Sequence, residues 1–209
     1  PGLPPRSAGA ARGSPPPRRG ELTRPAADDL THAGPAPSRT LDGVSRHDGA
    51  RVAEQLERRP APQLDGVAER VVGYRLLGHE PGEHAGLPSP TMTFIVSFDA
   101  PLTLSVLPDG RSGPDEFWAM VSGLHDRPAT ILHDGNQHGI QIDVSPLHAR
   151  ALFGCPAAAI SRVAAPLDEV WGPLGDELVE RLDGPSSWTE RFDVVDAVLG
   201  ARLDQVRRG

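Results

Sequence analysis

The chain has 209 residues and a formal net charge of −7 at pH 7. It contains no lysine, and residues 1–60 carry 10 arginines against 7 acidic residues, whereas residues 61–209 carry 11 against 21. A domain that binds nucleic acid is usually basic at its binding surface. The acidic segment of residues 61–209 is therefore not expected to bind DNA itself. The single cysteine, Cys155, excludes an internal disulfide and predicts a reducing, cytoplasmic compartment, and no apolar run is long enough to span a membrane.

Residues 1–63 are predicted to form a disordered tail. The segment is rich in proline, glycine and arginine, includes the run Pro15-Pro16-Pro17, and contains no phenylalanine, tyrosine or tryptophan. Such a segment has too little apolar surface to offset the entropy lost on ordering. Residues 64–209 are long enough to bury the core of one domain. We expect that domain to have its strands at about 69–144 and its helices at about 145–207.

Alternating apolar and polar residues predict the strands. In residues 91–98 four apolar side chains alternate with threonine and serine, and Ile95 alone breaks the pattern, on the outer face. Residues 102–106 alternate again after a short gap, so these two segments are predicted to form a hairpin. Further strands are predicted at 117–122, 129–132 and 139–144. Short strands separated by turn signals indicate an antiparallel barrel or sandwich; with helices after it, the fold class is α+β.

Helical signals begin where the strands end. Ser145-Pro146 offers an N-cap followed by proline at the first helical position, and Gly154 closes that segment. Two more short helices are predicted at about 167–171 and 174–182.

The last helix has the clearest pattern in the sequence. Ser187 and Glu190 form an S-x-x-E capping box, and the helix is predicted to continue to Arg207. An apolar stripe follows at helical spacing: Trp188, Phe192, Val195, Leu199, Leu203 and Val206. The stripe either packs on its own domain or pairs with the same helix of a second copy, because the spacing also fits a short a/d seam. The second interpretation predicts a homodimer.

Three groups of short motifs occur in order between residues 64 and 205. The first is Gly73-Tyr74-Arg75 with Gly86-Leu87-Pro88-Ser89-Pro90 leading into Thr93-Phe94-Ile95-Val96; the second is Gly123-Leu124-His125 with Arg127-Pro128; the third is Gly139-Ile140-Gln141-Ile142 with Phe153-Gly154-Cys155-Pro156-Ala157. In this order and spacing they resemble the sensor module that precedes the DNA-binding domain of AraC/XylS-type transcription regulators.

The resemblance implies a cupin-like barrel that senses a small-molecule effector, dimerisation through the C-terminal helices, and a role in regulating transcription. In such regulators two helix-turn-helix units follow the long helix, whereas this chain ends at Gly209. DNA is therefore expected as a partner only through a C-terminal domain that is missing here. The alternative is a stand-alone small-molecule-binding protein or a metal-dependent cupin protein, and the identity of the effector stays open.

Neither a metal nor catalysis is expected. His79 and His84 flank Pro81-Gly82, which predicts a polar loop, and the chain lacks the H-x-H pair with which a metal-binding cupin strand holds its ion. The sequence also contains no nucleophile elbow, P-loop or dinucleotide-binding glycine motif. We therefore expect a protein that is not an enzyme and uses no cofactor.

A ligand pocket in the barrel is the remaining site hypothesis. Its candidate residues lie near the second motif group and at the start of the long strand: Ser89, Trp118, His125 and Arg127. Arg127 could pair with a ligand carboxylate, although a surface ion pair would also explain it. In the opposite hypothesis the barrel is packed solid by Phe94, Phe98, Val121 and Ile142 and serves only protein interaction.

Overall fold

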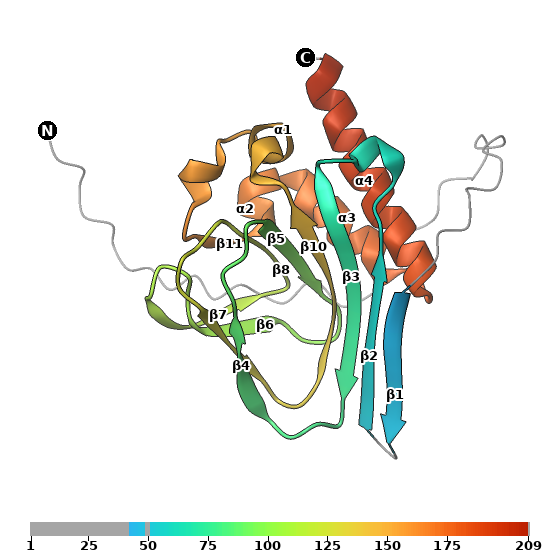
Figure 1. The fold of residues 1–209 in the computed structure, drawn as a ribbon, viewed down its shortest axis with the longest axis vertical. Coiled ribbons are helices and arrows are strands. Elements are labelled where there is room, and N and C mark those ends of the chain that lie inside the picture. The colour runs from blue at the N-terminus through green and yellow to red at the C-terminus, as the bar shows by residue number, and fades with distance from the viewer. Residues whose placement is uncertain (1–41, 49–50, 209) are drawn as a thin grey trace, which may run out of the picture. The chain divides into compact units, whose positions relative to one another are not determined.

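The computed structural model describes residues 42–48 and 51–208 (Figure 1). Within them two antiparallel sheets are followed by a group of helices, so the predicted α+β class, an antiparallel sandwich with C-terminal helices, is confirmed. The predicted disorder of residues 1–41 lies outside the described residues.

The larger sheet, called the large sheet below, contains seven of the described strands. Their spatial order is β1 (Asp42–Asp48), β2 (Arg51–Arg58), β3 (Ala68–Leu77), β10 (Gln137–Val144), β5 (Met92–Ser97), β8 (Ala119–Ser122) and β11 (Ala164–Pro166). The small sheet contains four, in the order β4 (Gly82–Gly86), β9 (Ala129–His133), β6 (Leu102–Val106) and β7 (Ser112–Phe117).

The helical segments of the described residues are mostly short. They are the 3-10 turns η1 (Pro62–Leu64), η2 (Pro146–His148) and η3 (Ala157–Ile160), and the helices α1 (Ala149–Phe153), α2 (Leu167–Trp171), α3 (Pro173–Asp183) and α4 (Trp188–Arg208). Gly154 adopts φ 72° and donates its N–H to the Arg150 carbonyl at 3.0 Å, which ends α1 as predicted. None of these helices has the length and apolarity needed to cross a bilayer.

The large sheet has two faces of opposite character. The side chains of Val71, Phe94 and Ile142 lie in the main core together with residues of α1, α2, α3 and α4. Successive side chains of a strand point to opposite faces. The polar residues that alternate with these three in sequence therefore point toward the small sheet. The main core therefore lies between the large sheet and the helices, and not between the two sheets.

This arrangement reverses the predicted orientation of the long strand. Ile95, predicted on the outer face, lines the space between the sheets and packs against the second core. The hypothesis of a barrel packed solid by Phe94, Phe98, Val121 and Ile142 is wrong, because these side chains belong to the core on the helix side. The physical reason is that the helices provide an apolar surface, and the apolar faces of the strands cover it.

The predicted hairpin is also wrong. β5 pairs with β10 and β8 in the large sheet, whereas β6 pairs with β7 and β9 in the small sheet. The segment between β5 and β6 thus crosses from one sheet to the other. Alternation identifies a strand and its faces, but it does not specify which strand lies alongside.

Ordered structure begins earlier than predicted. β1 and β2 lie inside the segment assigned to the tail, and β2 pairs with β3 from Val52↔Leu77 to Arg58↔Val71. Little apolar surface is needed here because these strands extend a sheet that β3 and β10 already form. The predicted boundary at residue 64 is therefore corrected for residues 42–58.

The segment around His84, predicted to be a polar loop, forms a strand from Gly82 onward. β4 pairs with β9, from Gly82↔His133 to Gly86↔Ala129, and lies at the edge of the small sheet. The prediction of a loop fails because an exposed edge strand needs no apolar face.

Helix α4 begins as the capping box predicts. The Glu190 N–H donates to Ser187 Oγ at 3.3 Å, and the Ser187 N–H donates to Glu190 Oε2 at 3.2 Å. The hydrogen bonds also hold the pKa of Glu190 below its ordinary value. These reciprocal bonds satisfy donors that would otherwise be unpaired at the helix start.

The apolar stripe of α4 packs on its own domain. Four of its five predicted dimer residues are buried in the main core, namely Phe192, Val195, Leu199 and Leu203. The fifth, Trp188, lies against β3 at Gly73, where a Cβ atom would overlap the indole ring. These five side chains thus make contacts within the chain, whereas Val206 at the end of the stripe is 44% exposed. A homodimer stays a prediction.

Candidate functional site

The space between the two sheets is filled on one side only. A second, smaller core occupies the side of β6, β7 and β8, with the residues Leu102, Leu104, Phe117, Met120, Ala129 and Ile131. The other side, between β2, β3 and β10 of the large sheet and β4 and β9 of the small sheet, holds a cavity of about 230 Å³. We call it the inter-sheet cavity.

The walls of the inter-sheet cavity combine polar and apolar side chains. The polar ones are Gln55, Arg70, Tyr74, His84, Gln137 and Gln141, and the apolar ones are Val72, Leu76, Ile95, Leu102 and Ile131. Small-molecule sites are usually more apolar than this wall, and they use a few convergent polar groups to orient the ligand. The lining thus provides hydrogen-bonding groups for a polar ligand of modest size.

Strand register explains why polar groups gather on this wall. Arg70 of β3 lies directly opposite Asp143 of β10, which in turn lies opposite Thr93 of β5. Gln141 lies two residues before Asp143 on the same face. Three neighbouring strands therefore place Arg70, Asp143, Thr93 and Gln141 in one continuous polar row at the wall of the cavity.

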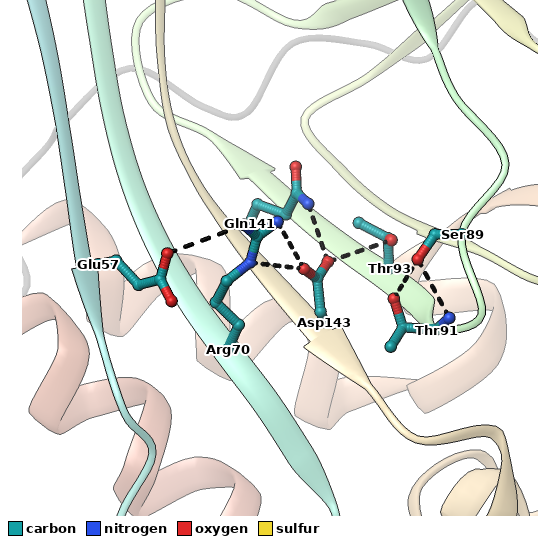
Figure 2. A network of polar contacts seen from close by, with 7 residues as sticks. All are labelled: Glu57, Arg70, Ser89, Thr91, Thr93, Gln141 and Asp143. Atoms are coloured by element: carbon teal, nitrogen blue, oxygen red, sulfur yellow. Dashed lines mark hydrogen bonds and ion pairs between the residues drawn. The ribbon is translucent and has the colours of Figure 1, made fainter. Parts of the chain in front are cut away.

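Asp143 is the centre of this row (Figure 2). Its Oδ2 accepts from Arg70 Nε at 2.9 Å and lies 2.9 Å from Arg70 NH2. Its Oδ1 accepts from Gln141 Nε2 at 2.8 Å and from the Thr93 hydroxyl at 3.4 Å. The carboxylate is buried, with 11% of its side chain exposed, and all of these contacts come from groups that donate to it.

Arg70 has a second acidic neighbour. Its NH1 lies 3.8 Å from Glu57 Oε2 on β2, and 42% of the Arg70 side chain is exposed, toward the cavity that it lines. The guanidinium is thus fixed between two carboxylates while part of it remains accessible.

A second cavity of about 250 Å³ adjoins the first, and we call it the loop cavity because the β5–β6 and β9–β10 connections contribute to it. Tyr74, Leu102 and Gln137 line both cavities. Burial raises the pKa of Tyr74 to about 12, although a hydrogen bond with the Ser97 side chain opposes the shift. Tyr74 is therefore a neutral hydroxyl at physiological pH, on the wall between the cavities.

His138 connects the loop cavity to helix α4. Its Nδ1 lies 2.8 Å from Asp99 Oδ2, its Nε2 lies 3.1 Å from Arg191 NH1, and its ring meets Trp188 edge-on at 5.5 Å. Burial lowers the pKa of His138 and outweighs the opposing effect of Asp99. A neutral imidazole then donates from Nδ1 to Asp99 and accepts at Nε2 from Arg191.

The histidines considered for a metal site are separated. His84 and His133 lie with ring centroids 5.8 Å apart, but His79 Nε2 instead lies 2.9 Å from the Val52 carbonyl oxygen. Burial, followed by repulsion from His133, lowers the pKa of His84. Within residues 42–48 and 51–208, no three metal-ligating side chains of His, Cys, Asp or Glu come together.

None of the four predicted ligand residues lines either cavity. Ser89 Oγ lies 2.6 Å from Thr91 Oγ1 just before β5, as Figure 2 shows. Trp118 is 43% exposed between β7 and β8. His125 Nδ1 lies 2.6 Å from the backbone oxygen of Arg127, whose side chain is exposed in the β8–β9 connection. They do not form one site.

Alternation predicts that the polar residues of a half-buried strand lie on its outer face, so it does not identify the residues that line the inter-sheet cavity. A signal existed in the sequence, however. The apolar stripe of α4 needs an apolar sheet face to cover it, and the apolar residues of β10 are the alternate ones, Ile140, Ile142 and Val144. The polar residues between them, Gln141 and Asp143, then face away from the helices.

Comparisons with known proteins give a structural similarity but no family. No protein-family model matches the chain, and no curated protein matches it. Among solved structures, a cupin domain from Bordetella pertussis Tohama I is similar over 53% of this chain and 99% of that chain, with 14% sequence identity and a TM-score of 0.28.

Proposed function

We propose that the inter-sheet cavity binds a small polar molecule, and that the chain is the effector-sensing part of a transcription regulator of the AraC/XylS type. The observation that carries the first part is the polar row of Arg70, Gln141 and Asp143 beside a cavity. Asp143 is buried, and its hydrogen bonds hold Arg70 and Gln141 in place at the cavity wall.

The position of the sequence motifs supports the second part of the proposal. Tyr74 belongs to the first motif group and Gln141 to the third, and both line the inter-sheet cavity. The resemblance to AraC-type sensors thus includes residues of the cavity wall.

A contact between cavity and helix supports a sensing role. His138 lines the loop cavity and also contacts Arg191 and Trp188 of α4. A ligand that moves the end of β10 would change these contacts, so α4 could pass the change to a domain that follows it.

The Gln141→Leu substitution tests the binding proposal. It removes the amide from the cavity wall, and the affinity for a ligand found by thermal-shift screening is expected to fall about threefold to tenfold, the usual effect of one neutral hydrogen bond. Titration calorimetry measures the change. The control is Gln205→Leu, at an exposed position of α4. Equal affinity in the two variants would argue against the inter-sheet cavity as the site.

The source DNA tests the regulator proposal. Reading on in frame after the codon for Gly209 is expected to give roughly a hundred codons with two helix-turn-helix patterns and an excess of basic residues. A stop codon at that point would favour a stand-alone binding protein instead.

A further inference from the structure

The inter-sheet cavity contains one strongly basic group. Among its described lining residues, Arg70 is the sole lysine or arginine side chain. An arginine in a cavity normally favours carboxylate or phosphate ligands, because the guanidinium forms paired hydrogen bonds with two oxygens. Whether it does so here depends on which of its nitrogens are already engaged.

Asp143 engages Arg70 on the side that faces the sheet. Nε and NH2 both lie 2.9 Å from Asp143 Oδ2, and the remaining terminal nitrogen, NH1, lies 3.8 Å from Glu57. Two carboxylates thus surround one guanidinium, so the local charge near Arg70 is negative overall. A carboxylate ligand would add a third negative charge next to two that are already present.

Asp143 also fixes the orientation of Gln141. A carboxylate only accepts hydrogen bonds, so the amide nitrogen of Gln141 must face Asp143, at 2.8 Å. The other amide atom, Oε1, therefore points away from Asp143, as Figure 2 shows. Gln141 offers an acceptor to the cavity, and its ligand partner must be an N–H or O–H donor.

We infer that Asp143 is a specificity-determining residue that makes the inter-sheet cavity select uncharged ligands bearing N–H or O–H donors, and reject carboxylates. Asp143 does this without lining the cavity, by neutralising Arg70 and by orienting Gln141. The inference rests on the proposed function, since it names the class of ligand for the same cavity.

The experiment compares amide and acid forms of the same molecules. The probes are propanamide with propanoate, and nicotinamide with nicotinate, titrated into the full chain by calorimetry. The wild-type protein is expected to bind an amide at least tenfold more tightly than its matching acid.

The Asp143→Asn variant is expected to reverse this preference. Asparagine keeps the size but removes the charge; its amide oxygen can still accept from Arg70 or Gln141, whereas its amide nitrogen cannot. Without the neutralising charge of Asp143, the Arg70 guanidinium should raise the affinity for the acids about tenfold to a hundredfold, as for hydrogen bonds between charged groups. Asp143→Ser serves as a second variant if the first does not fold, as judged by circular dichroism.

Asp109→Asn is the matched control. Asp109 also pairs with an arginine, with Arg111 Nε at 2.8 Å, but on an exposed turn that lines neither cavity. This variant changes the net charge equally and should retain the wild-type preference.

The outcomes separate the inference from the proposed function. Wild-type protein that binds the acids as tightly as the amides, or folded Asp143 variants that gain no affinity for the acids, would overturn the inference. If the wild type binds no probe while the Asp143 variants bind the acids, the masking of Arg70 is supported and the proposed function is contradicted.

Discussion

Replacing Arg58 with alanine is expected to lower the free energy of unfolding by about 3–5 kcal/mol, the usual cost of removing one partner from a buried ion pair. The Arg58 side chain is 4% exposed at the end of β2, and its NH1 and NH2 lie 2.6 Å from Asp193 and Asp196 of α4. Its guanidinium also lies 5.2 Å from the centre of the Phe192 ring. The substitution would remove the ion pair between Arg58 and the buried Asp196.

Urea unfolding followed by circular dichroism measures this loss. Arg58→Met is a useful second variant, because it keeps most of the aliphatic volume and removes only the charge and the donors. The control is Arg181→Ala, which removes an exposed pair with Glu177 within α3 and should change stability by at most about 0.5 kcal/mol. Similar losses at positions 58 and 181 would mean that β2 does not hold α4 in place.

Phe94→Ala is expected to cost about 3–5 kcal/mol, as is typical when a large side chain is removed from a packed core. Phe94 is fully buried, with its ring centroid 5.0 Å from that of Phe153 and 4.9 Å from that of Trp171. The substitution would leave a space where β5 meets α1 and α2, and the surrounding helices could collapse into it only partly.

The neighbouring residue provides the comparison. Ile95 is half-buried and lines the inter-sheet cavity, so Ile95→Ala should cost only about 1 kcal/mol. Chemical unfolding of both variants under the same conditions gives the two values. A larger loss at position 95 than at position 94 would place the principal core between the sheets and contradict the face assignment.

The sequence predicts the elements of this fold better than their arrangement. The capping box at Ser187 sets the start of α4 because it is a local interaction, and the φ of Gly154 ends α1 for the same reason. Most strands of residues 68–144 also follow from alternation. These signals depend on residues close together in the chain.

Pairing and orientation depend on residues far apart in the chain. The sequence predicts that β5 and β6 are neighbours because they are consecutive, yet β5 pairs with β8 and with β10, whose paired residues lie more than forty positions from those of β5. Likewise, β2 is ordered by β3 and by the pairing of Arg58 with α4, and the composition of β2 alone gives no sign of either. Such contacts come from the tertiary fold, which local patterns do not encode.

The sequence predicts that a ligand cavity is present, but not which residues line it. This cavity is predicted within the sandwich, but its candidate residues, such as Trp118 and Arg127, are those of conspicuous type near the second motif group. The residues that line it, such as Arg70 and Gln141, lie within strands. Their role becomes visible only when the register brings Arg70 opposite Asp143 and the helices are known to cover the other face.

The two-faced large sheet also affects how this protein can diverge. Along β10, the residues at 140, 142 and 144 pack against the helices, whereas those at 141 and 143 face the small sheet. Under the proposed function, folding therefore depends on one set of alternate positions of this strand, and ligand recognition depends on the other set. A lineage could therefore exchange the polar positions one at a time and acquire a new ligand, while the apolar positions beside them continued to hold the fold together.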